Sequence, residues 1–191
     1  MRIKCCGITR AEDARSAEVC GADAIGVVVF SPTSLREVPL KRAREIFDAV
    51  GPFITRVAVS HTTSNDDLDQ ILALHPDAIQ LSHPFVFQKK PGANVIRVIG
   101  RNDPLPTRCD AIIVDESHGS GREFDRSHAR GVVQRSKVPV ILAGGLTPEN
   151  VADAIRQVQP YAVDVASGIE KVPGIKDHRK IAAFIAAARN T

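Results

Sequence analysis

The chain has 191 residues, of which 43% are hydrophobic and 25% charged, and its formal net charge is +3. This balance is typical of a soluble globular protein with a sizeable core. The charge is too small and too dispersed to indicate nucleic acid as the main partner, although it is compatible with a small anionic ligand.

The N-terminal residues 1–4 lead directly into the first apolar run, without the hydrophobic region of a signal peptide. No apolar run reaches the roughly 18 residues of a membrane span. We therefore expect a cytoplasmic protein without membrane contact, in which the cysteines are reduced. Cys5, Cys6, Cys20 and Cys109 form no CxxC pair, and the histidines are scattered, so we expect no metal site. A disulfide between the neighbours Cys5 and Cys6 would be strained.

Eight short runs rich in valine and isoleucine recur along the chain, and such runs predict strands that are buried on both faces. They cover residues 2–6, 23–30, 54–60, 77–81, 94–100, 110–115, 138–144 and 161–167. Helical patterns alternate with them over residues 11–21, 40–51, 64–75, 147–158 and 177–190. Gly21 is a natural C-cap, Ser64, Thr147 and Asp177 are N-cap candidates, and Pro148 fits the first helical position.

Alternation of strands and helices predicts an α/β fold with a parallel sheet, and eight repeats favour closure into a compact (β/α)8 TIM barrel. We expect one domain over residues 1–191. The segments 82–93 and 101–109 are too short or too rich in proline for full helices. The helices after the fourth and fifth strands are therefore predicted to be shortened or missing. An open doubly wound sheet is the alternative.

Two glycine turns follow the last two predicted strands. Gly144 and Gly145 come directly after the seventh strand, and Ser167 and Gly168 after the eighth. In a barrel these turns are neighbours at the C-terminal face, where backbone N–H groups and a short helix commonly hold a phosphate. Residues 168–172 could form that helix. The alternative is that the glycines only make tight turns.

The first strand separates its two thiols, because neighbouring side chains on a strand point to opposite faces. Cys5 shares a face with Ile3 and should pack against helices. Lys4 and Cys6 should then point into the barrel, with Cys6 at the catalytic end of its strand. A nearby Lys4 ammonium would favour the reactive thiolate. The alternative is that Cys6 is a small buried filler.

Three further charged residues are candidates for the site. Asp115 ends the sixth strand and Asp164 lies in the eighth, and both should face inward. A carboxylate there is costly unless it is functional or paired, and the alternative for Asp115 is a structural ion pair with Lys4 as the candidate partner. The glycine-bearing loop 117–123 is suited to closing over a ligand. Arg36, in the loop 31–38, could bind a substrate carboxylate or be a solvated surface residue.

Taken together, these pieces resemble the phosphoribosylanthranilate isomerase family, the barrel enzymes of tryptophan biosynthesis. The resemblance is carried by "KCCGIT", "ADAIGVVVFSPTSLREV", "IIVDESHGSGREFD", "VPVILAGGLTPENVADAI" and "PYAVDVASGIEKVPGIKD". These segments span nearly the whole chain, and residues 82–109 match least. The "VVV" second strand and the "VSHTT" stretch look more like archaeal members than bacterial ones.

The resemblance implies an Amadori rearrangement without cofactor, which converts N-(5-phosphoribosyl)anthranilate to the 1-deoxyribulose 5-phosphate. Cys6 resembles the general base at sugar C2, and Asp115 resembles the general acid that opens the furanose ring. Arg36 would bind the anthranilate carboxylate, and Asp164 would line the site. The phosphate would be held by the two glycine turns, at Gly144, Gly145, Ser167 and Gly168.

Departures from the family pattern concern the pocket floor and one loop. The family's "QLHG" reads "QLSH" here, so Gln80 matches and Ser82 stands at the histidine position. Arg126 replaces a common tryptophan, and His118 replaces a loop glycine. The rival readings are the related isomerase of histidine biosynthesis, which uses an aspartate in place of Cys6, and a non-catalytic phosphate-binding barrel.

A homodimer is a further expectation. With two helices short, the outward faces of the fourth to sixth strands need a cover, which Phe85 and Phe87 could supply in part. A partner subunit would otherwise cover them, because large exposed apolar patches are unusual on monomers. The residues assigned to these faces are Ile79, Leu81, Ile96, Val98, Ile112 and Val114.

Overall fold

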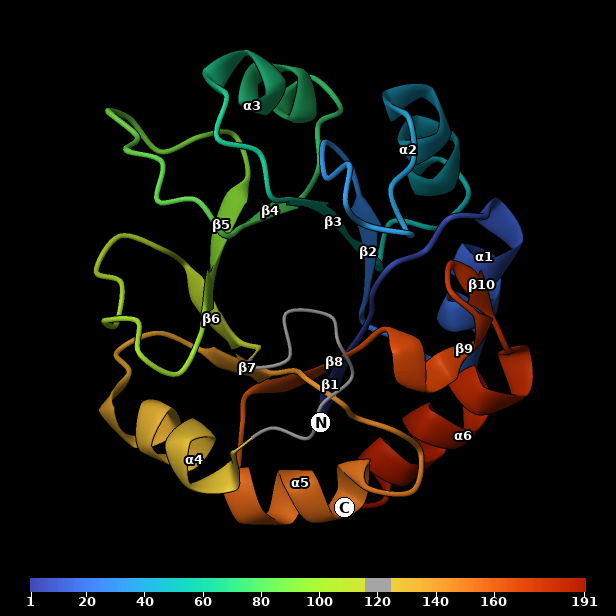
Figure 1. Cartoon of the computed structure of the whole chain (residues 1–191). Helices are drawn as coiled ribbons and strands as arrows, with labels where there is room; N and C mark the ends of the chain where they lie inside the picture. The colour runs from blue at the N-terminus through green and yellow to red at the C-terminus, as the bar shows by residue number, and fades with distance from the viewer. Residues whose placement is uncertain (116–124) are drawn as a thin grey trace.

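A computed structural model describes residues 1–115 and 125–191 of the chain. Eight parallel strands form a closed barrel in sequence order, with β8 paired to β1 (Figure 1). They are β1 (Arg2–Cys5), β2 (Ala24–Val28), β3 (Thr55–Ser60), β4 (Ala78–Leu81), β5 (Asn94–Ile99), β6 (Ala111–Val114), β7 (Val140–Leu142) and β8 (Ala162–Val165). The predicted barrel is confirmed, and the open doubly wound sheet is wrong.

Helices surround the barrel on its outside (Figure 1). They are α1 (Ala11–Cys20), α2 (Leu40–Phe47), α3 (Asn65–Leu72), α4 (Arg126–Arg135), α5 (Val151–Val158) and α6 (His178–Arg189). Three predicted caps are confirmed. Gly21 ends α1 in the left-handed conformation, the Ser64 side chain accepts a hydrogen bond from the N–H of Asp67, and Asp177 caps α6.

Two helix predictions need correction. The helix expected from Thr147 begins only at Val151, because the Asn150 side chain closes a turn ahead of it. Its Oδ1 accepts from the N–H of Thr147 at 2.8 Å, and its Nδ2 donates to the Gly145 carbonyl at 2.9 Å. The sequence patterns also missed α4, a polar helix in which only Ala129 and Val132 are buried. Its weak apolar stripe explains the miss.

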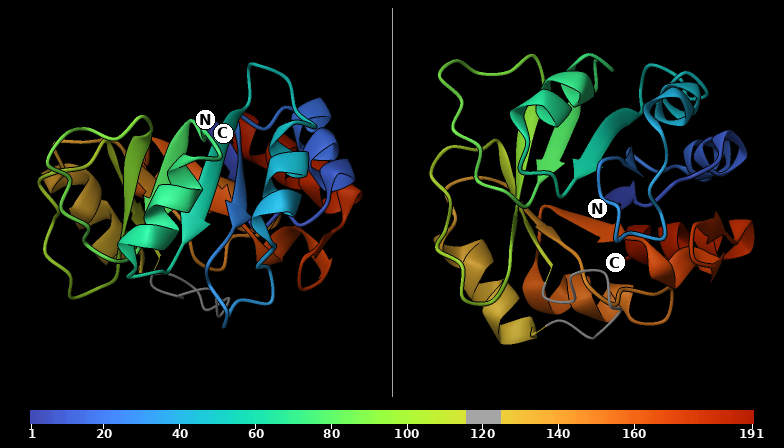
Figure 2. Two further views of the ribbon diagram at one scale, coloured as in Figure 1. Left: turned by 90° about the horizontal axis from the view of Figure 1, so that it is seen from above. Right: turned by 45° about the horizontal axis from the view of Figure 1, so that its top comes forward.

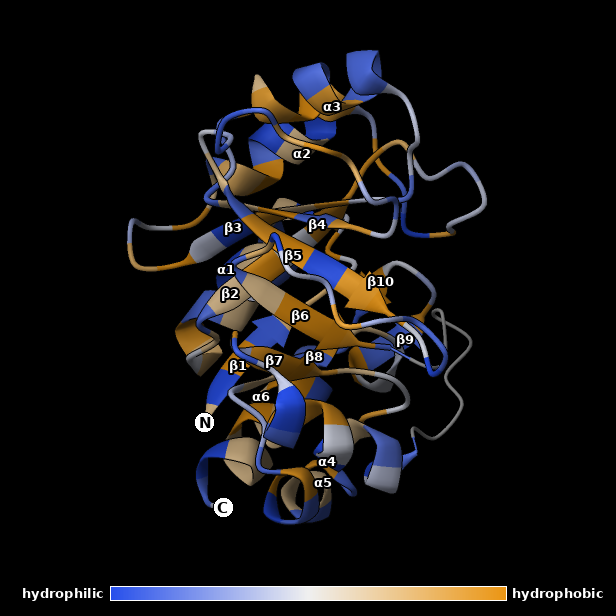
Figure 3. Ribbon diagram, turned by 90° about the vertical axis from the view of Figure 1, so that its left-hand side faces the viewer, coloured by the Kyte–Doolittle hydropathy of each residue, from blue (hydrophilic) through white to orange (hydrophobic). Residues whose placement is uncertain are grey.

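No helix forms after β4 or β5, in segments that the structure describes completely, as the sequence predicted. Figure 3 looks onto this side of the barrel, where β5 and β6 lie in front without a covering helix. Phe85 and Phe87 pack against the core there. Arg97, on β5, donates hydrogen bonds to the backbone carbonyls of Ser82, at 3.1 Å, and His83.

The register expected for β5 was off by one residue. Val95 and Ile99 pack in the outer core, whereas Ile96 and Val98 belong to the cluster inside the barrel. Both faces of this strand are apolar, so hydropathy alone could not assign them. The outward faces of β4 to β6 are nevertheless covered by the chain itself, and this removes the reason for expecting a partner subunit to cover them.

The barrel wall separates two apolar cores. One lies between the strands and the helices, and the other fills the interior, where strand arrows all run toward the same end (Figure 2). Cys5 belongs to the outer core and Cys6 to the inner one, as the alternation along β1 predicted. In the described part of the chain, none of the helices is long and apolar enough to cross a membrane.

Candidate active site

The C-terminal end of β1 brings Lys4 and Cys6 onto the interior face of the barrel. Gly26 of β2 makes room for both, since a Cβ atom there would lie 2.8 Å from the Cys6 Sγ and 3.0 Å from the Lys4 Nζ. The thiol is only 7% exposed. A side chain at position 26 would therefore push Cys6 and Lys4 out of the interior face.

Lys4 and Asp164 form a buried ion pair across neighbouring strands. The Lys4 Nζ donates to Oδ1 of Asp164 at 2.8 Å, and both side chains are less than 10% exposed. Burial alone would lower the pKa of Lys4, but the charges of Asp164 and Cys6 and the hydrogen bonds to these two side chains together outweigh it and raise that pKa, so the ammonium stays charged. The partner of Lys4 is thus Asp164, and the alternative that paired it with Asp115 is wrong.

The environment of Cys6 does not favour the thiolate in the simple way that the sequence suggested. Burial raises the pKa of the Cys6 thiol and the Asp164 charge adds to this, while Lys4 lowers it by a smaller amount. Lys4 acts on Cys6 in the predicted direction, because it lowers the pKa of the thiol, but burial and the Asp164 charge outweigh it. Burial thus opposes the thiolate at Cys6, whereas positive charge beside the thiol favours it.

The glycine turns after β7 and β8 touch each other. Gly144 and Gly145 both have positive φ, at 92° and 62°, a conformation that favours glycine. Gly168 lies so close to the first turn that a Cβ atom would be 2.0 Å from the Leu146 carbonyl oxygen. Ser167 begins a single 3₁₀ turn, η1 (Ser167–Ile169), after which β9 (Glu170–Val172) follows. The helix expected over 168–172 is therefore wrong beyond its first residues.

Gly168→Ala is expected to force the two turns apart, because the carbonyl oxygen at 2.0 Å cannot accommodate a methyl group. We expect about a tenfold higher KM for a phosphorylated substrate and a loss of roughly 1–3 kcal/mol in the free energy of unfolding. Steady-state kinetics and urea unfolding measure both. Gly92→Ala is the matched control, since a Cβ atom there meets nothing within 4 Å. Equal effects in the two variants would contradict the expected role.

One pocket gathers most of the predicted site residues. It is lined by Arg36, Asp115, Asp164, Ser167 and the backbone from Ala143 to Leu146. The residues that sequence analysis placed at four different strand ends therefore share one space. Cys6 adjoins it through Lys4 and Asp164, and its charge is close enough to affect the pKa of Arg36.

Arg36 is not a solvated surface residue. Its Nε and Nη2 donate to the two carboxylate oxygens of Glu170 at 2.8 and 2.7 Å. This bidentate pair raises the pKa of Arg36 through its hydrogen bonds. The arginine side chain also crosses Gly7, where a Cβ atom would be 2.4 Å from the Arg36 Cδ. It thus lies over the end of β1, directly after Cys6.

Sequence analysis missed Glu170 and Lys176 as parts of the site. Lys176 lies in β10 (Ile175–Lys176), which pairs with β9 in a small hairpin. Its Nζ donates to Oε1 of Glu170 at 2.9 Å. The available signal was three charged residues, Glu170, Lys171 and Lys176, in an otherwise apolar stretch, "GIEKVPGIK". Nothing in their spacing pointed to Arg36, which is 134 positions away from Glu170.

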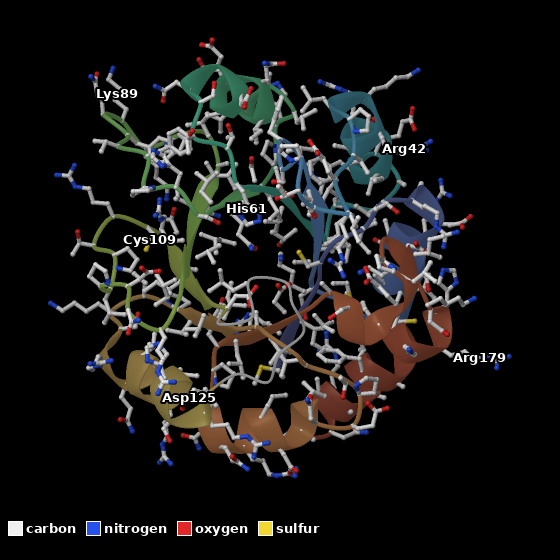
Figure 4. All side chains as sticks on the ribbon, in the orientation of Figure 1. Arg42, His61, Lys89, Cys109, Asp125 and Arg179 are labelled. Atoms are coloured by element: carbon white, nitrogen blue, oxygen red, sulfur yellow. The ribbon has the colours of Figure 1, made fainter. Side chains whose placement is uncertain are left out.

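Two of the departures from the family pattern lie in the described part of the chain, Ser82 directly after β4 and Arg126 at the start of α4. Ser82 is hydrogen-bonded to the His61 ring at 2.7 Å, so a histidine from the neighbouring strand reaches this position. Figure 4 shows His61 near the barrel opening, while Arg42, Lys89 and Arg179 point outward from the rim. Arg126 donates to the Gln157 side chain of α5 at 3.0 Å. The loop 117–123, with His118, lies outside the described residues.

The fold and the site define a (β/α)8-barrel enzyme with a thiol, two carboxyl groups and two glycine turns at one end of the barrel. A model of one family, described as "N-(5'phosphoribosyl)anthranilate (PRA) isomerase", matches residues 3–187. The chain belongs to this family of isomerases.

Relatives and solved structures agree with this assignment. The N-(5'-phosphoribosyl)anthranilate isomerase of Methanoregula boonei is 68% identical over 99% of this chain and 97% of the relative, which confirms the resemblance to archaeal members. That of Haloferax volcanii is 40% identical over 98% and 93%. The crystal structure from Thermus thermophilus has a TM-score of 0.85 at 33% identity and covers 100% of this chain and 99% of its own.

Another solved relative, 33% identical with a TM-score of 0.82 and complete coverage of both chains, contains reduced 1-(o-carboxyphenylamino)-1-deoxyribulose 5-phosphate. A thiamine phosphate pyrophosphorylase from Pyrococcus furiosus is only 15% identical, and its TM-score of 0.72 indicates a common fold and nothing more.

Proposed function

We propose that the chain catalyses the Amadori rearrangement of N-(5-phosphoribosyl)anthranilate to 1-(2-carboxyphenylamino)-1-deoxyribulose 5-phosphate in tryptophan biosynthesis. The observation that carries the proposal is the single pocket in which Asp115, Asp164, Arg36 and both glycine turns meet, next to Cys6. The glycine turns in its lining suit a phosphate and Arg36 suits a carboxylate, which are the two anionic groups of this substrate. No cofactor enters the proposed reaction.

Asp115 is the proposed general acid and Cys6 the proposed general base. Asp115 protonates the furanose oxygen, the C1–O bond breaks, and the nitrogen lone pair forms the C1=N bond of a protonated imine. The Cys6 thiolate then takes the proton from C2; the electron pair of that C–H bond forms the C1=C2 bond of an enolamine, and the C=N pair returns to nitrogen. Loss of the proton from the C2 hydroxyl group and addition of a proton at C1 give the ketone, so substrate and product are isomers and no oxidant or reductant is needed.

The two ends of the substrate would be fixed by opposite sides of the pocket. The backbone at Gly144, Gly145 and Gly168, together with Ser167, would bind the phosphate, and Arg36 would bind the anthranilate carboxylate. Asp164 keeps Lys4 charged beside the thiol. Holding both ends orients C2 between the base and the acid, which lowers the entropic part of the barrier.

The direct test is a fluorescence assay for the loss of phosphoribosylanthranilate with the purified protein and no added cofactor. We expect loss of the substrate and formation of the ketose. If the substrate is bound but not converted, the non-catalytic barrel is the correct reading. If the protein converts only the aminoaldose of histidine biosynthesis, the protein is instead the related isomerase of that pathway.

The rate is expected to depend on pH through Cys6. Because burial and the Asp164 charge raise the pKa of this thiol, the thiolate fraction and therefore kcat/KM should increase from neutral to alkaline pH. Lys4→Met removes a charge that lowers this pKa, so its pH–rate curve should shift to higher pH. Steady-state rates across this range measure both curves. A curve that is flat, or that moves to lower pH in Lys4→Met, would contradict a thiolate base.

A homodimer and a cytoplasmic location stay proposals. One solved relative is described as monomers generated from the dimeric Thermotoga maritima enzyme. In this chain Val86, in the loop that replaces the helix after β4, is 81% exposed and would be covered in an interface on that side. Sedimentation velocity at increasing concentration tests the dimer, and a strict monomer at high concentration would rule it out.

A further inference from the structure

Arg36 is held from one side only. The Nε of Arg36 donates to one carboxylate oxygen of Glu170 at 2.8 Å, and one hydrogen of its Nη2 is donated to the other at 2.7 Å. The opposite edge of the guanidinium, formed by Nη1 and the other hydrogen of Nη2, has no hydrogen bond to a described residue. An arginine has two edges that can each bind a carboxylate through paired N–H groups. One edge is thus used within the protein, and the other remains for a ligand in the pocket that Arg36 lines.

Glu170 is itself rigidly placed. It is 7% exposed, and its Oε1 also accepts from the Lys176 Nζ at 2.9 Å and from the N–H of Gly174 at 3.1 Å. Burial would raise the pKa of Glu170, but the hydrogen bonds from Arg36 and the Lys176 charge outweigh it and lower that pKa. The carboxylate is therefore charged and fixed before any substrate arrives.

The same contacts connect Arg36 to the turn after β8. Lys176 is 1% exposed, and its Nζ donates to the Ala166 carbonyl at 3.0 Å as well as to Glu170. Ala166 directly precedes the turn at Ser167 and Gly168. The distance between the arginine edge and the turn after β8 is thus set by two short polar contacts on a buried lysine.

We propose that Glu170 is a positioning residue for carboxylate recognition: it holds one edge of Arg36 so that the other edge faces the carboxylate of the substrate. Lys176 anchors Glu170 to the phosphate turn and so fixes the spacing between the two ends of the bound substrate. This inference rests on the proposed function, in which Arg36 binds the anthranilate carboxylate.

A change in the charge of Glu170 distinguishes a positioning role of this residue from a purely electrostatic one. Arg36 and Lys176 carry two positive charges and Glu170 one negative charge, so the three residues keep a net positive charge beside the pocket. Glu170→Gln removes the negative charge from this group. If charge alone mattered, a ligand carboxylate would then bind more tightly. If Glu170 positions Arg36, binding becomes weaker although the attraction is greater.

The experiment compares two ligands that differ only in the carboxylate. One is reduced 1-(o-carboxyphenylamino)-1-deoxyribulose 5-phosphate, and the other is the same compound made with aniline, which lacks the carboxylate. Calorimetry gives the Kd of each for wild type and Glu170→Gln, and the ratio of the two Kd values measures carboxylate recognition. We expect Glu170→Gln to lower the preference for the carboxylate ligand about tenfold, or about 1.4 kcal/mol. The aniline ligand should bind as it does to wild type.

Three variants complete the test. Asp77→Asn is the matched control, because it removes another bidentate arginine pair, with Arg56, outside the pocket, and it should leave the preference unchanged. In an Arg36→Ala background, Glu170→Gln should have no further effect on the preference. If Glu170→Gln does not fold, Glu170→Asp decides, since it keeps the charge beside Lys176 but is one methylene too short to span both cations.

The outcomes distinguish the two proposals. Equal weakening of both ligands by Glu170→Gln, or an unchanged or increased preference, would overturn the positioning role. If Arg36→Ala itself leaves the carboxylate preference intact, the assignment of Arg36 in the proposed function fails instead. If wild type binds neither ligand, the proposed function fails as a whole.

Discussion

Cys6→Ala is expected to abolish turnover, with kcat lowered about 10²–10⁴-fold, the range of a positioned general base. The thiol is 7% exposed on the interior face of the barrel, close to the charges of Lys4 and Asp164. Alanine offers no basic atom at this place, while the two ends of the substrate keep their contacts. The Kd of reduced 1-(o-carboxyphenylamino)-1-deoxyribulose 5-phosphate should therefore change little. Single-turnover kinetics and calorimetry measure the two effects.

The neighbouring thiol provides the control. Cys5 is fully buried in the outer core, where burial raises its pKa to about 12 and keeps it neutral. Cys5→Ser places a hydroxyl in apolar surroundings, which should cost roughly 1–3 kcal/mol of the free energy of unfolding but leave kcat near wild type. Cys6→Ser should show the reverse pattern. If the two substitutions exchanged their effects, the assignment of base to Cys6 would be wrong.

Asp115→Asn is expected to have an effect of similar size. The amide has almost the same shape as the carboxyl group but cannot give a proton to the furanose oxygen, so we expect kcat to fall about 10²–10⁴-fold. The phosphate turns do not involve Asp115, and affinity for the reduced product analogue should be nearly unchanged. Stopped-flow assays and the Kd of the analogue measure these quantities.

Asp110 is the matched control for Asp115, because it flanks the same strand at its opposite end. Its carboxylate accepts from the Lys90 Nζ at 2.7 Å and from the N–H of Val95 at 2.8 Å, away from the pocket. Asp110→Asn should lower stability slightly and leave kcat intact. Full activity in Asp115→Asn, or a loss of activity as large in Asp110→Asn, would remove the general-acid assignment.

The sequence predicted the faces of β1 and failed at those of β5, for a physical reason. In β1, Lys4 marks the interior side because it needs a buried partner, and Asp164 supplies one. In β5, the charged residue is Arg97, and it lies on the outer side, where it donates hydrogen bonds to the backbone carbonyls of Ser82 and His83. A charged residue therefore lies on the inner face of β1 and on the outer face of β5, so charge by itself does not identify the inner face of a strand.

The parts of the candidate site that depend on local backbone conformation could be predicted from the sequence. The ion pairs between residues that lie far apart in the sequence could not. Gly144 and Gly145 have the positive φ that their place after a strand suggested. The partner of Arg36 could not be found in this way, because Glu170 lies on the β9–β10 hairpin and no hydrophobic periodicity in the sequence predicts that hairpin. Local rules determine turns and caps, whereas ion pairs across the sheet depend on the closed barrel.

Because no helix follows β4 or β5, one side of the barrel wall has an outer layer of helices, called here the thick wall, and the other side lacks it, called here the thin wall. The strands that carry Cys6 and the phosphate turns are backed by α1, α5 and α6, whereas β5 is covered only by irregular chain (Figure 3). Asp115 follows β6, beside the thin wall. The proposed base therefore stands on the side that is backed by helices, and the proposed acid next to the side that lacks them. Because fewer packed elements oppose a displacement there, we expect changes in the distance between base and acid to occur mainly on the side of Asp115.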